Sequence, residues 1–146
     1  MKIQQLSLFL ENKPGHLYSV AKALADAKVN ILTLSLADTQ QFGILRLIVK
    51  DTQKAKGILE KAGCVVNITE VVATEVTDRP GGLAEILKVL DEGRVNIEYM
   101  YAFTFRRGDK AVLVFRFDNP DAAIRVLQAA GINVIGSVEL YARAEG

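Results

Sequence analysis

The sequence predicts an α+β fold made of two consecutive units that share one order of elements, βαββαβ. Three observations predict it. Segment 12–17, Asn-Lys-Pro-Gly-His-Leu, returns at 78–83 as Asp-Arg-Pro-Gly-Gly-Leu. The triplet Val-Asn-Ile at 29–31 returns, at the same offset, at 95–97. Within each half, the alternation typical of a strand and the spacing typical of a helix follow one another in the same succession. A repeat of this length is too long for a solenoid and indicates two small domains.

Length and composition fit two domains, which we place at residues 1–70 and 71–146. A domain of about 70 residues buries only about 60% of the surface that its unfolded chain exposes, so it gains stability by packing against a second one. The chain is 50% hydrophobic. Two explanations fit this fraction equally well, namely densely packed cores and apolar surface used for contact between domains or subunits.

The first half follows the predicted order. Leu6, Leu8 and Leu10 stand at alternate positions, which predicts a first strand. Pro14 then suits the first turn of a helix, because the N–H that proline lacks would be unpaired there. The elements predicted next are a helix over 17–25, a strand over 30–36, a turn over 38–41, a strand over 42–49, a helix over 52–62 that Gly63 ends, and a strand over 64–72.

The second half repeats this order with no linker before it. Val72, Thr74 and Val76 alternate and predict its first strand. The elements predicted next are a helix over 83–90, a strand over 96–105, a turn over 106–109, a strand over 111–117, a helix from Pro120 to Ala130, and a last strand over 132–142. Each half therefore has the ferredoxin-like order, which makes an antiparallel sheet with two helices on one face.

Charge and hydropathy exclude several classes of function. The formal net charge is +1, with acidic and basic residues interleaved, so the basic stripe that binds nucleic acid is not expected. The ferredoxin-like order also occurs in RNA-recognition modules, but their aromatic motif is not found here. No apolar run approaches the roughly 20 residues of a membrane span. The N-terminus lacks the apolar centre of a signal peptide, so we expect a cytoplasmic protein.

The chain carries one histidine, His16, and one cysteine, Cys64. These two residues cannot make a zinc site, and a single cysteine forms no intramolecular disulfide. No serine or cysteine nucleophile has a candidate base other than His16. We therefore expect no metal, no cofactor and no catalytic residue, with Cys64 as a small buried hydrophobe.

The most closely repeated residues lie in the turn between the first strand and the first helix of each half. Gly15 and Gly81 let the backbone approach a ligand closely, because no Cβ intervenes. The helix that follows offers free N–H groups and the positive end of its dipole, which favour a carboxylate. The amides of Asn12 and Asn30 each combine a donor with an acceptor and suit a zwitterion. The structural alternative is that Asn12 and Asp78 cap the helices and that Pro-Gly only turns the chain.

The first half resembles the ACT domain family of small-molecule regulatory modules. The resemblance lies in the succession of a strand, the segment Glu-Asn-Lys-Pro-Gly-His-Leu, a helix and the triplet Val-Asn-Ile. The resemblance covers both halves and implies two ACT-like domains that merge side by side into an eight-stranded sheet. In that family this loop pattern marks the site of a regulatory amino acid. Its serine-binding members, which control phosphoglycerate dehydrogenase, have ligand-contacting asparagines at the positions of Asn12 and Asn30. Leu10 stands where those members have a histidine, which argues against serine itself.

We expect the ligand between the two halves, in two unequal sites. Asp78 stands where the first half has Asn12, and since it only accepts hydrogen bonds it disfavours a carboxylate. Gly82 likewise stands in place of His16. The occupied site is expected at Asn12 and Asn30, completed by the second half near 96–100. The candidate ligand-binding residues are Asn12, Lys13, Pro14, Gly15, His16, Leu17, Asn30, Ile31, Asp78, Arg79, Pro80, Gly81, Gly82, Leu83, Asn96, Ile97, Glu98, Tyr99 and Met100.

The sequence thus predicts a non-catalytic regulatory protein that binds a small ligand, an amino acid first of all, at the interface between its two domains. We expect the partner to be a regulated metabolic enzyme or a second copy of the chain in a homodimer, because no effector domain is recognised. Two alternatives stay open. One is a constitutive structural or interaction subunit without ligand, and the other is a small enzyme, since a fold does not determine function.

Overall fold

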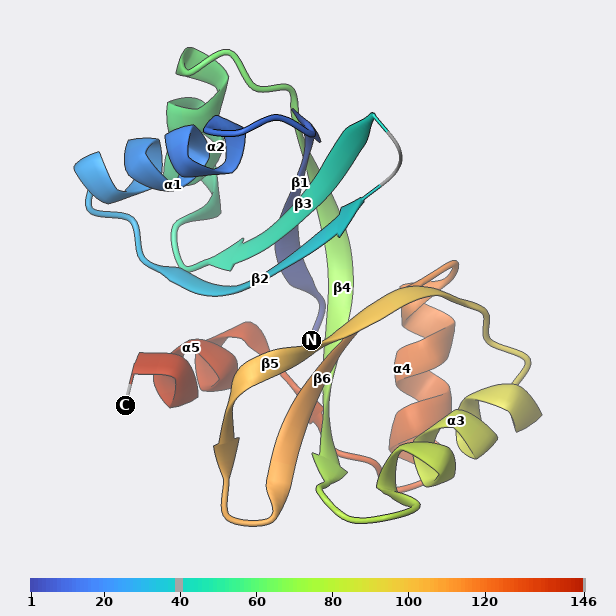
Figure 1. Ribbon diagram of the computed structural model, residues 1–146. Coiled ribbons are helices and arrows are strands. Elements are labelled where there is room, and N and C mark those ends of the chain that lie inside the picture. Colours follow the sequence, from blue (N-terminus) through green and yellow to red (C-terminus); the bar gives the residue numbers. More distant parts are fainter. Residues whose placement is uncertain (39–40, 146) are drawn as a thin grey trace. The chain divides into compact units, whose positions relative to one another are not determined.

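The computed structural model describes residues 1–38 and 41–145, without the side chains of 38, 104–107 and 145 (Figure 1). It divides the chain into two compact units. We name Gln4–Thr69 the N-terminal unit, and Met1–Ile3 together with Glu70–Gly146 the C-terminal unit. Each is described by itself. The turn predicted over 38–41 includes residues 39–40, which lie outside the described residues.

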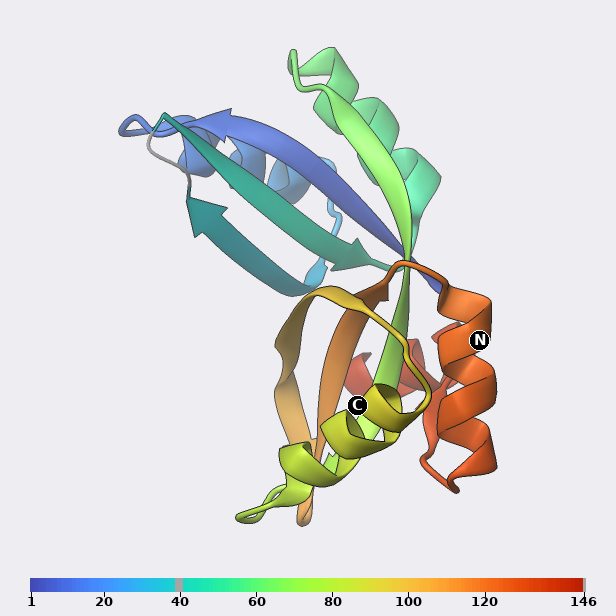
Figure 2. The ribbon, with the colours of Figure 1, turned by 90° about the vertical axis from the view of Figure 1, so that its right-hand side faces the viewer.

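The N-terminal unit has the predicted ferredoxin-like order. Its elements are β1 (Ile3–Glu11), α1 (His16–Asp26), β2 (Ile31–Asp38), β3 (Phe42–Val49), α2 (Thr52–Lys61) and the start of β4 (Val66–Thr77). The strands lie in the order β2-β3-β1-β4, and β3 pairs antiparallel with both β1 and β2. Helices α1 and α2 cover one face of this sheet (Figures 1 and 2).

Local chemistry explains where these elements begin and end. The side chain of Asp51 caps α2 by accepting a hydrogen bond from the Lys54 N–H at 3.1 Å. After α2, Gly63 adopts a φ of +92°, a left-handed conformation that ends the helix at little cost for glycine. The period of two in β1 turns Leu6, Leu8 and Leu10 toward the helices. The core residues they meet are Val20, Leu24, Leu45, Leu47, Ala55 and Leu59.

The C-terminal unit repeats the order. After β4 come α3 (Gly82–Glu92), β5 (Ile97–Arg107), β6 (Lys110–Phe117), α4 (Pro120–Ala129), β7 (Val134–Ile135) and α5 (Ser137–Glu145). The strands lie in the order β7-β4-β6-β5 and all pair antiparallel. Because β5 reaches Arg107, the turn predicted over 106–109 is shorter than expected. The rings of Phe115 and Phe117 stack in the core with centroids 5.4 Å apart.

The prediction of eight strands is wrong by one, because β4 serves both units. The strands expected over 64–72 and from Val72 to Val76 are a single strand of 12 residues. Its first residues belong to the N-terminal unit, and the part from Glu70 onward belongs to the C-terminal unit. No glycine, proline, asparagine or aspartate occurs between 68 and 77 to interrupt it. The described residues therefore form seven strands.

The last strand, predicted over 132–142, is also wrong. Only Val134 and Ile135 pair with β4, and α5 follows after Gly136. The residues after Gly136 are mostly good helix formers. Val138 is exposed whereas Leu140 is fully buried, as expected for a helix, in which these two side chains point in different directions. A strand would have placed both on one face.

Helix α5 lies on the sheet face opposite α3 and α4 (Figure 1). Along β4, Val72 and Val76 pack in the core beneath α3 and α4, so Glu75 points to the other face. There Glu75 meets Arg143 of α5, the two side-chain atoms lying 3.1 Å apart. The expectation of helices on one face therefore holds for α3 and α4, while α5 adds a cover on the second face.

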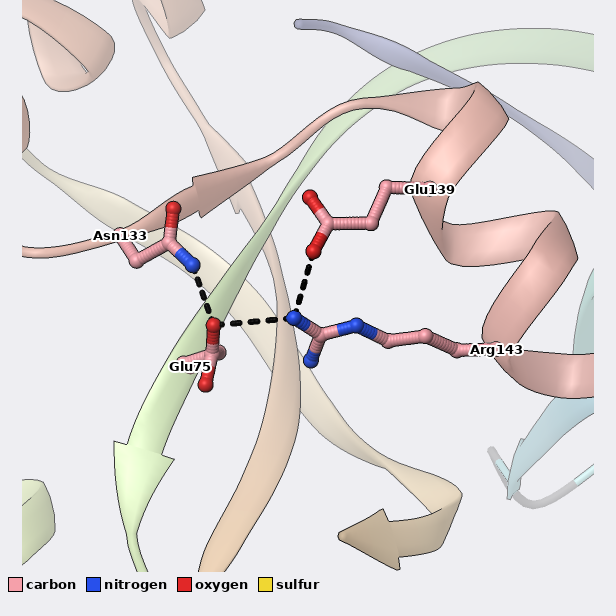
Figure 3. A network of polar contacts seen from close by, with 4 residues as sticks. All are labelled: Glu75, Asn133, Glu139 and Arg143. Atoms are coloured by element: carbon pink, nitrogen blue, oxygen red, sulfur yellow. Dashed lines mark hydrogen bonds and ion pairs between the residues drawn. The ribbon is translucent and has the colours of Figure 1, made fainter.

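A polar network ties α5 to β4 (Figure 3). The Arg143 nitrogen Nη2 lies 3.1 Å from Glu75 Oε1 and 2.5 Å from Glu139 Oε1. Asn133 also donates a hydrogen bond to Glu75. Burial lowers the pKa of the Arg143 guanidinium, but hydrogen bonds to Glu139 and Glu75 outweigh it and raise that pKa above its ordinary value. The Arg143 and Glu75 side chains are only 14% and 17% exposed, so solvent screens this pair far less than a surface pair.

Replacing Arg143 by methionine is expected to destabilise the C-terminal unit by about 2 kcal/mol. The substitution removes the cation that pairs with the mostly buried Glu75 carboxylate, and that carboxylate then keeps only the hydrogen bond from Asn133. Urea unfolding followed by circular dichroism measures the loss. Glu139→Gln is the control, since Glu139 is half exposed and should change stability by less than about 0.5 kcal/mol. Equal, small effects of both variants would contradict a structural role for the Glu75–Arg143 pair.

Candidate functional site

The two repeated turns have the same backbone conformation. Gly15 precedes α1 with a φ of +88°, and Gly81 precedes α3 with a φ of +87°. Both are left-handed N-caps, and neither helix has a side-chain capping hydrogen bond. The N-cap positions are therefore Gly15 and Gly81, and not Asn12 and Asp78 as the structural alternative has them. The two glycines occur because a side chain at such a positive φ would strain the backbone.

Backbone hydrogen bonds hold each turn against the sheet in the same way. The Asn12 N–H donates to the Gln41 carbonyl at 3.1 Å, and the Asp78 N–H donates to the Asp109 carbonyl at 2.7 Å. Each turn is thus tied to the residue just before β3 or β6. The repeat therefore extends from the sequence to the backbone hydrogen bonds.

The first turn of α1 leaves donors available. The His16 N–H makes a long hydrogen bond of 3.4 Å to the Lys13 carbonyl. Within the described part of the chain, the N–H groups of Leu17 and Tyr18 have no backbone acceptor, as is usual in the first turn of a helix. Both residues are exposed. An anion placed at Gly15 could therefore accept hydrogen bonds from this turn and would meet the positive end of the helix dipole.

Gly82 makes the second turn chemically different from the first. A Cβ at Gly82 would lie 2.1 Å from the Thr77 carbonyl oxygen, so no side chain fits there. The first unit carries His16 at the same place, and that side chain is half-buried. The second half therefore has glycine at this position because α3 begins close to the Thr77 carbonyl at the end of β4.

The strand register separates the two asparagines that sequence reasoning combined. Glu11, before Asn12, pairs with Phe42 at the start of β3, whereas Ile31, after Asn30, pairs with Val49 at its end. Since β3 has 8 residues, these points lie about 23 Å apart at ~3.3 Å per residue. A single small ligand cannot touch both within one unit.

The same separation exists in the C-terminal unit. Thr77, before Asp78, pairs with Lys110 at the start of β6, and Ile97, after Asn96, pairs with Phe117 at its end. Each unit therefore presents its Pro-Gly turn at one end of its sheet and its Val-Asn-Ile segment at the other.

The remaining predicted residues are spread along the two units. Asn12, Asn30 and Asn96 are exposed, as are the residues on both sides of the two prolines. Ile31, Ile97, Tyr99 and Met100 are half-buried. Three charged side chains of the two units form ion pairs, Lys13 with Glu11 at 2.8 Å, Arg79 with Glu85 at 3.3 Å, and Glu98 with Arg116 at 3.4 Å.

A cavity that the sequence does not predict lies beside each turn. The N-terminal cavity, of about 600 Å³, lies where β1 ends, α1 and β3 begin, and residues 62–65 lead into β4. The C-terminal cavity, of about 480 Å³, occupies the equivalent place at 75–77, α3, the start of β6 and 130–133. Of the predicted ligand-binding residues, only His16 and Gly82 line them. The repeated Ala-Gly pair at 62–63 and 130–131, with positive φ at both glycines, was the signal that could have found them.

The N-terminal cavity combines apolar walls with a few polar groups. Phe9, Phe42 and Val65 are among the residues that line it, and all three are exposed. Glu11 stands at its edge, and a hydrogen bond from Lys13, together with the charge of Lys13, holds the pKa of the Glu11 carboxyl below its usual value. Glu11 is therefore a carboxylate at neutral pH. Cys64 also lines the cavity, and burial raises the pKa of its thiol, which keeps it neutral.

No group of three or more histidine, cysteine, aspartate or glutamate side chains gathers to hold a metal ion among the residues that the structure describes. In the same residues, no helix has the length and apolar character that crossing a membrane requires.

A family sequence model described as an ACT domain pair matches residues 1–142. The chain belongs to the ACT domain pair family. The resemblance seen in the two Pro-Gly turns is thereby confirmed, and so is the α+β architecture of two βαββαβ units. The family assignment rests on nearly the whole chain.

Solved structures agree with this ACT domain pair. The crystal structure of protein BT0572 from Bacteroides thetaiotaomicron is similar with a TM-score of 0.89 and 40% identity, over 97% of this chain and 96% of that one. The regulatory subunit of aspartate kinase from Thermus thermophilus has a TM-score of 0.64 and 18% identity, over 87% and 91%. That from Thermus flavus has a TM-score of 0.62 and 17% identity, over 87% and 91%. The last two likenesses show the fold alone. No curated protein matches the sequence.

Proposed function

We propose that this ACT domain pair is a non-catalytic regulatory protein that binds an amino acid at the turn between β1 and α1. One observation supports the proposal. The helix begins at an exposed, left-handed Gly15 without a side-chain cap, and among the described residues the N–H groups of Leu17 and Tyr18 have no backbone acceptor. A ligand carboxylate can accept from Leu17 and Tyr18 and gain the dipole of the helix.

The charges and amides nearby suit the second charge of an amino acid. The Asn12 side chain is exposed and does not cap α1, so its oxygen can accept a hydrogen bond from an ammonium group. The Glu11 carboxylate next to it offers the opposite charge. An amino acid with both ends charged therefore matches this turn better than a simple anion does.

The position of the ligand between the two units stays a prediction. The strand register supports one restriction, namely that Asn12 and Asn30 of the N-terminal unit do not share one ligand. We infer that Asn12 belongs to the amino-acid site. The other contacts of the ligand then come from groups other than Asn30 of the same unit.

Regulation would follow from a difference in affinity. A ligand that binds one conformation more tightly shifts the population toward it, and a partner can detect that shift. Two relatives of this fold are described as regulatory subunits of aspartate kinase. For this chain we propose a partner of the same general kind, a metabolic enzyme, or a second copy of the chain in a homodimer.

A constitutive interaction subunit is the second candidate. The exposed side chains of Leu34 and Leu36 favour it, because they lie on β2, an edge strand of the N-terminal unit. Exposed apolar residues at a sheet edge are typical of surfaces that pair with another chain. This candidate needs no ligand.

Thermal unfolding in the presence of each of the twenty amino acids separates the two candidates. A bound amino acid at one hundred times its Kd stabilises the protein by about 2.7 kcal/mol, a shift of several degrees in Tm. An unchanged Tm with all twenty would contradict the amino-acid proposal and favour the constitutive subunit.

Asn12→Ala is expected to weaken binding of the active amino acid at least about tenfold, because one hydrogen bond to a charged group contributes roughly 1.5–3 kcal/mol. Titration calorimetry measures the affinity and the stoichiometry. Asn67→Ala is the matched control, since Asn67 is an exposed asparagine on β4. Asp78→Ala should leave the tight site intact. Equal losses for Asn12→Ala and Asp78→Ala would contradict the unequal roles of the two turns.

A further inference from the structure

The N-terminal cavity has the size and the lining of a small-molecule pocket. Its volume of about 600 Å³ falls within the ~300–1,000 Å³ of typical ligand sites. All of its lining residues belong to the N-terminal unit. It opens beside the turn that begins α1, because Glu11 and His16 line it.

Three of the residues that line the cavity are large hydrophobic residues that the chain leaves exposed. Phe9 comes two residues before the end of β1, Phe42 begins β3, and Val65 follows Gly63 by two residues. All three are large, exposed hydrophobic residues. Exposed apolar groups around one cavity favour an apolar occupant, since each Å² removed from water contributes about 25 cal/mol.

In the C-terminal unit, polar residues stand at the positions equivalent to Phe9, Phe42 and Val65. The equivalent positions hold Glu75, two residues before the end of β4, Lys110 at the start of β6, and Asn133, two residues after Gly131. These polar groups already have partners within their unit. Glu75 binds Arg143 and Asn133, and Lys110 donates to the Thr77 hydroxyl at 3.0 Å.

We propose that the N-terminal cavity receives the side chain of the amino acid held at the β1–α1 turn, and that it selects a large apolar side chain, aromatic or branched. The inference rests on the proposed function. The charged groups of the ligand stay at the turn, near Glu11 and the first N–H groups of α1. The side chain lies against Phe9, Phe42 and Val65. The C-terminal cavity, with its paired polar lining, does not take the same ligand, so each chain binds one.

Titration calorimetry with L-phenylalanine, L-leucine, L-serine and L-aspartate tests this selection. We expect phenylalanine or leucine to bind at least about tenfold more tightly than serine or aspartate, because the apolar contact contributes more than about 1.4 kcal/mol. The expected stoichiometry is one ligand per chain.

Val65→Asn installs the residue of the C-terminal unit and is expected to weaken binding of the apolar amino acid about fivefold while leaving serine unchanged. Phe9→Glu, which likewise installs the residue of the C-terminal unit, should weaken it at least about tenfold. Val138→Asn is the matched control, because Val138 is 83% exposed and Val65 is 73% exposed, yet Val138 lies on α5 and does not line either cavity. An unchanged Tm without ligand shows that the variants fold.

The outcomes separate this inference from the proposed function. If serine or aspartate binds more tightly than both apolar amino acids, or if Val65→Asn and Phe9→Glu bind like the parent protein, the apolar subsite is overturned and the amino-acid site stands. If none of the twenty amino acids binds, both are overturned. Two ligands per chain would overturn the exclusion of the C-terminal cavity.

Discussion

Replacing Gly82 by alanine is expected to destabilise the C-terminal unit by about 3 kcal/mol, at the upper end of the usual effect of overpacking. The new Cβ would lie 2.1 Å from the Thr77 carbonyl oxygen and 3.2 Å from its carbon. Since both are backbone atoms, no side-chain rotation relieves the contact, and α3 must move away from the end of β4. Chemical unfolding followed by circular dichroism measures the change.

Gly57→Ala is the matched control for this substitution. Gly57 is an exposed residue within α2, and a Cβ built there meets nothing within 4 Å. Alanine at that position should stabilise the protein by about 0.5–1 kcal/mol, because glycine loses more backbone entropy in a helix. The same change of residue therefore has opposite signs at the two glycines. A Gly82→Ala variant as stable as the parent would contradict the close packing of the second turn.

Leu140→Ala is expected to reduce the stability of the C-terminal unit by about 3 kcal/mol, as for other fully buried leucines. Leu140 has no exposed surface, and it lies on α5. Val138→Ala is the control, because Val138 is exposed and should change stability by less than about 0.5 kcal/mol. Thermal and urea unfolding of both variants measure the contrast.

The pair of variants also distinguishes a helix from the strand that the sequence alone predicted over 132–142. In a strand, residues 138 and 140 share one face, and both substitutions would have similar effects. In a helix they point in different directions, so that only Leu140 is buried. Similar losses for the two variants would contradict α5.

The two copies of the unit have diverged at the place where a ligand would bind. The first turn carries His16 and opens on a cavity whose walls are mostly apolar, with Glu11 among the lining residues. The second carries Gly82 against the Thr77 carbonyl, and Glu75, Glu85 and Lys110 line its cavity. The backbone of the two turns is nevertheless the same. This divergence is the basis of the proposal that each chain binds one ligand.

Local sequence determined most elements of this fold. The strand over 42–49 was predicted with the bounds of β3, because a strongly apolar segment, interrupted only by Arg46, lies between two polar segments. Helices α1 to α4 were predicted within a few residues, since their apolar spacing marks them and Gly63 ends α2. The Pro-Gly turns were located because only glycine adopts a φ near +88° at little cost.

Burial and pairing over long distances decided the rest. The period of two over residues 64–77 does not distinguish two strands from one, because it is the same in both cases. Leu140 belongs to a helix because its burial and the pairing of Arg143 with Glu75, far away in the sequence, outweigh the local alternation. The separation of Asn12 from Asn30 follows from the register with β3, which only strand pairing establishes.

By itself, the sequence determined a duplicated ACT-type unit with a glycine turn before the first helix of each copy, because periodicity and positive φ are properties of neighbouring residues. Only the tertiary structure decided that β4 is one strand, that α5 replaces the last strand, and that a cavity with apolar walls lies beside the first turn. These features depend on which surfaces distant segments bury together.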